Sequence, residues 1–189
     1  KGKAKRISSL VSLGGMAGMP VSDSATRNVW HDISRTVIMP TLCDHYGHLN
    51  VRHYSALFND AAWQMMTLGG ISMADLKSRG LGTVVATLTI NFLHEVTVGQ
   101  LVLIRGAITQ VGSKSLSHEL RLYETGTMTH CATQKSVEVC FDMDKRASTP
   151  FPDDLRATLA SSATTQLVYR LSPARSVPSV SGYGFPVGQ

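Results

Sequence analysis

The 189-residue sequence is poor in cysteine, in aromatic residues and in long apolar runs. Its three cysteines, Cys43, Cys131 and Cys140, lack the close pairing that is typical of zinc sites. We therefore interpret them as free thiols in a reducing compartment, which favours a cytoplasmic protein. No apolar run approaches the ~18 residues that a membrane span needs. A Gly-x-Ser-x-Gly motif is also missing, which argues against a serine nucleophile of the common hydrolase type.

Acidic residues are scarce in the first 27 positions, where Asp23 is the only one. The net charge of +5 belongs to the two ends of the chain, because residues 28–152 hold ten basic and ten acidic residues. This distribution argues against a nucleic-acid partner for the globular part. Residues 1–27 are basic and rich in Ser and Gly, and we predict a disordered leader there. An organelle-targeting segment or an added extension is the alternative.

The length of the chain suits one domain with a sizeable core. We place this domain at residues 28–152, where periodic patterns are found. Residues 153–189 are rich in Ser, Pro, Gly and Thr, and we predict a disordered tail with at most two helical turns at its start.

The longest helical pattern runs from Val51 to Leu68, with apolar residues at spacings of three and four. Asn50 is a favourable N-cap, and Gly69 with Gly70 ends the pattern. A short second helix is expected between residues 72 and 80.

One strand is expected before this helix, at residues 29–40, and four strands after it, within residues 83–144. In the third of these four, Leu116, His118, Leu120 and Leu122 alternate with polar residues. In the last, Val137, Val139 and Phe141 alternate with Ser136, Glu138 and Cys140, which predicts that the first three face the core. The order of elements predicts an α+β fold with one antiparallel five-stranded sheet around one long central helix.

A polar loop joins the first strand to this helix, and Asp44 is its main candidate for chemistry. A carboxylate before a helix is often only a turn or capping residue. Here it stands near free N–H groups at the start of a helix, with Gly47 and His48 between them. That is a suitable place to stabilise an oxyanion beside a carboxylate.

Two other features allow alternative interpretations. Asp44 with His45, His48 and His53 could form a metal set, but these residues straddle a turn and a helix start, so we predict no metal site. Lys114, followed by Ser115, lies in a Gly-Ser turn, where it is either a solvated hairpin residue or a phosphate contact.

The segment from Asp44 to Ala61, DHYGHLNVRHYSALFNDA, and the order of the elements out to Pro152 resemble acyl-CoA thioesterases of the 4-hydroxybenzoyl-CoA thioesterase family. This resemblance implies the hotdog fold. It also implies hydrolysis of an acyl-CoA thioester to a carboxylate and free CoA, with no cofactor beyond the CoA of the substrate. A homodimer or homotetramer, with the site at the subunit interface, is implied as well.

In that family the acid at the position of Asp44 acts as nucleophile or general base, and the backbone amide near Val51 polarises the thioester carbonyl. We place His48 and Asn50 in the same catalytic group. The candidate substrate-binding residues are Gly47, Tyr54, Lys114 and Ser115. Trp63, Met65 and Met66 are interpreted as core or subunit contacts, or as the floor of an acyl pocket.

Some positions depart from the family pattern. Leu42 and Asn59 stand where many relatives carry an acid, so a second carboxylate role, for example at Asp60, is open. Two rival functions remain: an acyl-CoA binding or regulatory module without turnover, and a hydratase or dehydratase that uses His48 or His53.

Overall fold

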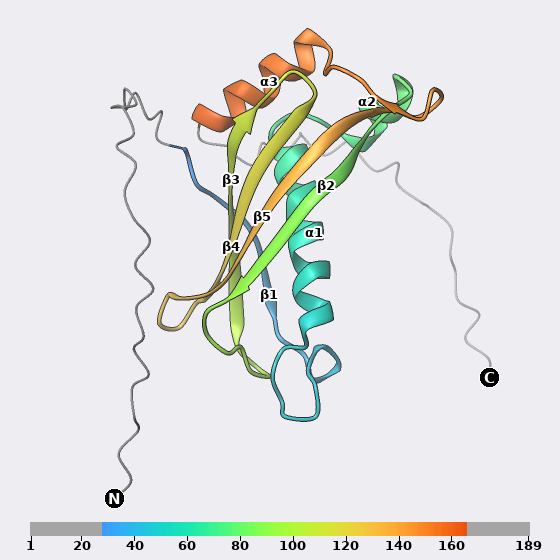
Figure 1. Cartoon of the computed structure of the whole chain (residues 1–189). Helices are drawn as coiled ribbons and strands as arrows, with labels where there is room; N and C mark the ends of the chain where they lie inside the picture. The colour runs from blue at the N-terminus through green and yellow to red at the C-terminus, as the bar shows by residue number, and fades with distance from the viewer. Residues whose placement is uncertain (1–27, 166–189) are drawn as a thin grey trace, which may run out of the picture.

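The computed structural model describes residues 28–165 as a curved antiparallel sheet with one long helix against one of its faces (Figure 1). The elements in chain order are β1 (His31–Val37), a 3-10 turn (Pro40–Leu42), α1 (Val51–Leu68), α2 (Met73–Ser78), β2 (Leu81–Phe92), β3 (Leu101–Val111), β4 (Ser115–Glu124), β5 (Thr129–Asp142), β6 (Ala147–Ser148) and α3 (Asp153–Thr164). The predicted first strand, long helix, short helix and four later strands are all confirmed.

The main sheet has the order β1-β3-β4-β5-β2, and the two-residue strand β6 pairs with β5. Strands β3, β4 and β5 form a meander, but β2 does not pair with β3, its successor in sequence. It lies beside β5 at the far edge of the sheet, with Leu81 opposite Asp142. The predicted α+β architecture of five antiparallel strands around a central helix is therefore confirmed, with β6 as an addition.

Helix α1 buries Tyr54, Phe58 and Met65 against the sheet, as its apolar spacing predicts. The packing of α1 against the sheet is tight at Gly106 of β3. A Cβ atom there would lie 2.7 Å from a methyl carbon of Leu120 and 2.8 Å from the sulfur of Met65. A larger residue at this position would therefore require these side chains to shift.

The predicted core face of β5 is wrong. Ser136, Glu138 and Cys140 are buried, whereas Val137 and Val139 are only partly buried, on the other face. The reason lies in the pairing with β4, because residues directly opposite each other in an antiparallel pair share a face. Leu116 is opposite Glu138 and His118 is opposite Ser136. The buried face of β4 therefore fixes the buried face of β5, despite the polar residues on it.

The predicted disordered tail from residue 153 is also wrong in its first part. Helix α3 buries Leu155 and Leu159, which lie one turn apart on the same side. It is held by a hydrogen bond from Ser162 Oγ to the carbonyl of Gly69 (3.1 Å) and by an ion pair between Arg79 and Asp154 (2.8 Å). The domain therefore extends at least to residue 164. Residues 1–27 and 166–189 lie outside the described part of the chain, and their predicted disorder stays a prediction.

The three cysteines are free thiols, as predicted. Cys131 and Cys140 are buried, and Cys43 is partly exposed. Between residues 28 and 165, no helix has the length and the apolar character required to cross a membrane. The cytoplasmic location stays a prediction.

We expect Leu159→Ala to lower the free energy of unfolding by about 2–4 kcal/mol, because it leaves a cavity beneath α3. Ala160→Ser, at the next and exposed position, should change it by less than about 0.5 kcal/mol. Chemical denaturation of both variants measures the difference. Equal stabilities would mean that α3 is not part of the cooperative core.

Candidate active site

Asp44 is held in a tight turn by its own side chain. Its Oδ1 accepts hydrogen bonds from the amides of Tyr46 (2.9 Å) and His48 (3.2 Å). Its backbone N–H donates to the carbonyl of His48 (2.8 Å). Gly47 closes the turn at φ +81°, a conformation that favours glycine. Among the described residues no group donates to Oδ2, so one oxygen of the carboxylate serves the turn and the other is available.

The turn is attached to the connection between β2 and β3. The amide of Leu49 donates to the carbonyl of Val96 (2.7 Å), and that of Val98 to Gly47 (3.2 Å). His48 and Thr97 form an isolated antiparallel bridge. These bonds fix Asp44 against a segment that lies about fifty residues later in the sequence.

The start of α1 leaves one amide free beside this turn. Asn50 caps the helix, because its side-chain oxygen accepts from the amide of Arg52 (3.1 Å) and its carbonyl from that of His53 (2.9 Å). Within the described residues the amide of Val51 has no acceptor. The first helical N–H group, at the positive end of the helix dipole, is therefore available for a ligand.

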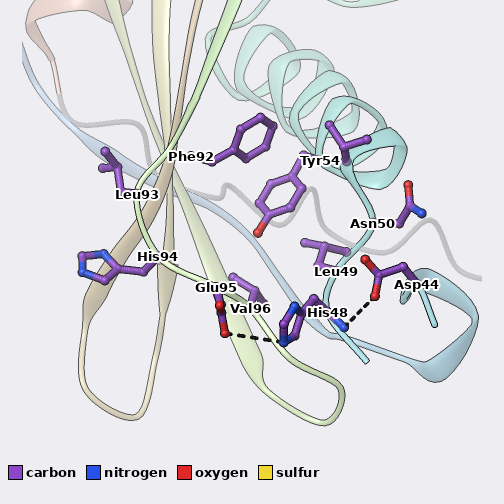
Figure 2. Close-up of a pocket in the computed structure, with 11 residues that line it drawn as sticks. Asp44, His48, Leu49, Asn50, Tyr54, Phe92, Leu93, His94, Glu95 and Val96 are labelled. Atoms are coloured by element: carbon purple, nitrogen blue, oxygen red, sulfur yellow. Dashed lines mark hydrogen bonds and ion pairs between the residues drawn. The ribbon is translucent and has the colours of Figure 1, made fainter. Parts of the chain in front are cut away.

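These groups line an open cleft of about 950 Å³ (Figure 2). It is lined by Asp44, His48, Leu49, Asn50, Val51, Tyr54, Phe92, Leu93, His94, Glu95 and Val96. The structure thus brings together all four predicted catalytic residues and Tyr54. Gly47 does not line the cleft, and contributes through the turn.

Lys114 and Ser115 are not near this cleft within one chain. Strand β3 runs from the cleft end of the sheet at Leu101 to the far end at Val111, roughly 30 Å away at ~3.3 Å per residue. The turn with Lys114 follows at that far end, close to α3 (Figure 1). A contact of this lysine with a ligand in the cleft would need a second chain.

The segment from Phe92 to Val96 forms the second wall of the cleft and was missed by the sequence analysis. The rings of Phe92 and Tyr54 meet edge to face, with centroids 4.9 Å apart. Glu95 Oε2 lies 3.5 Å from His48 Nε2. The sequence offers one weak signal for this wall, a polar His-Glu pair at the end of an apolar strand.

The electrostatic surroundings keep Asp44 ionised. Desolvation opposes its ionisation, but the amides of His48 and Tyr46 outweigh it and, together with the imidazoles of His48 and His45, hold the pKa of Asp44 below its ordinary value. Burial, with a smaller effect of Cys131, raises the pKa of Tyr54 to about 12, so this phenol stays protonated. The cleft therefore combines a carboxylate, which can act as nucleophile or base, with N–H and O–H donors.

The alternative metal set is not assembled. His53 Nε2 accepts a hydrogen bond from Arg52 (3.0 Å), and the ring of His45 lies against Tyr46 at 4.0 Å. Over residues 28–165, no group of three or more His, Cys, Asp or Glu side chains has an arrangement suited to a metal ion.

Two sequence comparisons with known proteins both find thioesterases. The family model of the thioesterase-like superfamily matches residues 38–159. A betainyl-CoA thioesterase of Pseudomonas aeruginosa is 25% identical over 153 residues, which cover 81% of this chain and 91% of that protein.

Solved structures share the fold. SAV2348 from Staphylococcus aureus, determined in complex with CoA, is 17% identical with a TM-score of 0.68, over 85% of this chain and 97% of that one. YbaW, a probable thioesterase from Escherichia coli, is 19% identical with a TM-score of 0.63, over 70% of this chain and 99% of that one. A 1,4-dihydroxy-2-naphthoyl-CoA thioesterase from Synechocystis is 14% identical with a TM-score of 0.63, over 70% of this chain and 96% of that one. These similarities confirm the predicted hotdog fold.

We expect the Asp44 carboxyl to titrate below the ordinary value of about 3.9 for Asp. Because its folded-state pKa is depressed, this carboxylate stabilises the fold above the unfolded-state pKa. The contribution is lost as the pH falls through the folded-state pKa. Carbon-13 NMR of the labelled carboxyl measures the midpoint. Gly47→Ala, which strains the turn, should move it upward, and a wild-type midpoint at or above about 3.9 would contradict the hydrogen-bonded turn.

Proposed function

The chain belongs to the thioesterase-like superfamily, and from this premise we propose that it hydrolyses acyl-CoA thioesters to a carboxylate and free CoA. The family and the curated relative together identify it as a thioester hydrolase. The observation that carries the finer proposal is the pairing of an ionised carboxylate, Asp44, with the unbonded amide of Val51 on one cleft.

In the proposed mechanism the thioester carbonyl oxygen accepts a hydrogen bond from the amide of Val51. The helix dipole adds to this interaction as negative charge develops on that oxygen. The free Oδ2 of Asp44 either attacks the carbonyl carbon or removes a proton from an attacking water. The other oxygen stays bonded to the amides of Tyr46 and His48, which keep the carboxylate oriented. In both routes the C–S bond breaks, and the departing CoA thiolate takes up the proton lost by the attacking water. In the nucleophilic route that water attacks the mixed anhydride formed with Asp44, which releases the carboxylate and restores Asp44.

His48 and Tyr54 have supporting roles in this proposal. His48, beside Glu95, borders the entrance of the cleft and fixes the turn through its backbone. Tyr54 presents a protonated hydroxyl and an aromatic face to the acyl group. The reaction as proposed uses neither a metal nor an organic cofactor, because Asp44 supplies the base or nucleophile and Val51 the oxyanion donor.

Two relatives support CoA as the thiol part of the substrate. One is a thioesterase for betainyl-CoA, and one structural neighbour was solved with CoA. The acyl group is best identified with a panel of short, long, aromatic and cationic acyl-CoAs in a free-thiol release assay. The same assay separates the hydrolase from a binding module, which releases no thiol, and from a hydratase, which leaves the thioester intact.

We further propose that the active unit is a homodimer or a dimer of dimers, formed through β2. This strand pairs with β5 along one edge, and no described strand pairs with its other edge. Four apolar side chains of this strand are about half exposed: Val84, Val85, Leu88 and Phe92. Such an edge is usually covered by association, and a two-fold axis allows one β2 to pair with another. In that dimer, Lys114 could reach CoA bound by the partner.

Asp44→Asn should lower kcat by about a hundredfold or more and leave the fold intact, because it removes the base or nucleophile and keeps the hydrogen-bond acceptor. Asp144→Asn is the matched control, since Asp144 is exposed in the turn after β5 and does not line the cleft. Thiol release and thermal melting of both variants are the measurements. Near wild-type turnover by folded Asp44→Asn would refute the assignment.

Leu88→Lys should weaken dimerisation by at least about tenfold, because it places two ammonium groups near the two-fold axis of the proposed β2 pairing. Thr109→Lys, on the exposed part of β3, should leave the mass unchanged. Light scattering over a concentration series measures both. A wild-type monomer at micromolar concentration would sink the dimer proposal.

A further inference from the structure

A second, smaller cavity lies between the C-terminal half of α1, the start of β2 and strand β5. Its volume is about 110 Å³, enough for a small ligand group. It shares no lining residue with the large cleft and is lined by Asn59, Ala62, Trp63, Met66, Thr83, Val85 and Glu138. Of these described lining residues, only Glu138 carries a charge.

Glu138 is an unusual residue for such a place, since a buried charge is costly without partners. Its Oε1 lies 3.0 Å from Nε2 of the buried His118, and Thr83 also hydrogen-bonds to it. Desolvation opposes its ionisation, but these two partners outweigh it and lower the pKa of Glu138. The carboxylate is therefore ionised at neutral pH.

The hydrogen bonding of His118 directs its ring at Glu138. His118 Nδ1 is buried and has no partner among the described residues, so the ring is held through Nε2, which lies 3.0 Å from Oε1 of Glu138. The carboxylate of Glu138 is the charged group that the described residues present to the cavity.

The other walls suit a compact cation. Trp63 offers an indole, the aromatic group that attracts alkylated ammonium ions most strongly, and Met66 a flexible thioether that packs around irregular groups. No lysine or arginine lines the cavity to neutralise Glu138. A carboxylate beside an aromatic ring is the combination that recognises a quaternary ammonium group.

We propose that this cavity binds a positively charged acyl group of the thioester substrate, and that Glu138 is the residue that determines this specificity. The inference rests on the proposed acyl-CoA hydrolysis, and it names the substrate class.

In this inference the cavity serves the cleft of a partner chain. In one chain, Val51 and Trp63 are twelve positions apart on α1, or roughly 18 Å, which a short acyl group does not span. In the proposed dimer, an antiparallel β2 pairing about the strand midpoint would set Leu81 opposite the partner's Phe92 and Thr83 opposite the partner's Ile90. The small cavity of one chain would then lie beside the part of the partner's β2 that leads into the large cleft.

A matched pair of substrates tests the charge requirement: trimethylammonioacetyl-CoA and 3,3-dimethylbutyryl-CoA, which have the same shape and differ in charge. We expect wild type to prefer the cation by at least about tenfold in kcat/KM, and Glu138→Gln to reduce this ratio to near one. Glu119→Gln, which changes a carboxylate on the opposite face of the sheet, should keep the wild-type ratio. Equal ratios in wild type and Glu138→Gln would overturn the inference and leave the proposed function standing.

A second variant covers the case in which Glu138→Gln does not fold. Asn59→Lys is on the exposed side of α1 and places a competing ammonium in the cavity, so it should also abolish the preference. An unchanged preference in this variant would overturn the inference. Thiol release from neither substrate, nor from any member of the wider acyl-CoA panel, would overturn the proposed function and the inference with it.

Mixed dimers test the partner arrangement. The experiment mixes Asp44→Asn chains with Glu138→Gln chains. If each site combines Asp44 of one chain with Glu138 of the other, a mixed dimer has one site with both substitutions and one site with neither. Activity toward the cationic substrate should then return to about half of the wild-type value per hybrid dimer. No recovery despite demonstrated subunit exchange would show that both residues act within one chain, and would overturn the partner arrangement.

Discussion

The packing of α1 against the sheet is tight around Gly106, and the arrangement of the long helix depends on it. With a glycine in β3, side-chain atoms of Met65 of the helix and Leu120 of β4 occupy the space next to the backbone that a Cβ would enter. The N-terminal end of the helix is held by other bonds, from the amide of Arg52 to the side chain of Asn50 and from the amide of Leu49 to the carbonyl of Val96. A side chain at position 106 would require Met65 or Leu120 to shift. The placement of the Val51 amide therefore depends both on the core packing of α1 and on the bonds at its start.

The carboxylate of Asp44 has a structural task and, in the proposed reaction, a chemical one. One oxygen closes the turn through two backbone amides, and the other accepts no hydrogen bond from the described residues. A common turn pattern can in this way leave one oxygen free for the proposed reaction. The amides that order the turn also favour the ionised form, so the geometry and the charge come from the same hydrogen bonds. This loop conformation itself requires Gly47, because few other residues adopt a φ of +81°.

Local signals predicted the parts of this structure that local interactions determine. The cap at Asn50, the length of α1 and the glycine turn follow from residues close together in sequence, and all are confirmed. The buried face of β5 was not predictable in this way, because β4 decides it through pairing. Helix α3 was missed because only Leu155 and Leu159 interrupt a small, polar composition. The wall from Phe92 to Val96 joins Asp44 only in the folded chain.

The far-edge position of β2 also has a kinetic consequence. The turns that join β3, β4 and β5 are short, so this meander can form from contacts between neighbours in sequence. Pairing β2 with β5 instead joins positions at least forty residues apart, from Phe92 with Ala132 to Leu81 with Asp142, which costs more chain entropy before any contact is gained. We therefore expect β2 to join the sheet late during folding. Since the Phe92 end of this strand is one wall of the cleft, and its start borders the small cavity, both binding regions would be the last to mature and the first to open in partial unfolding.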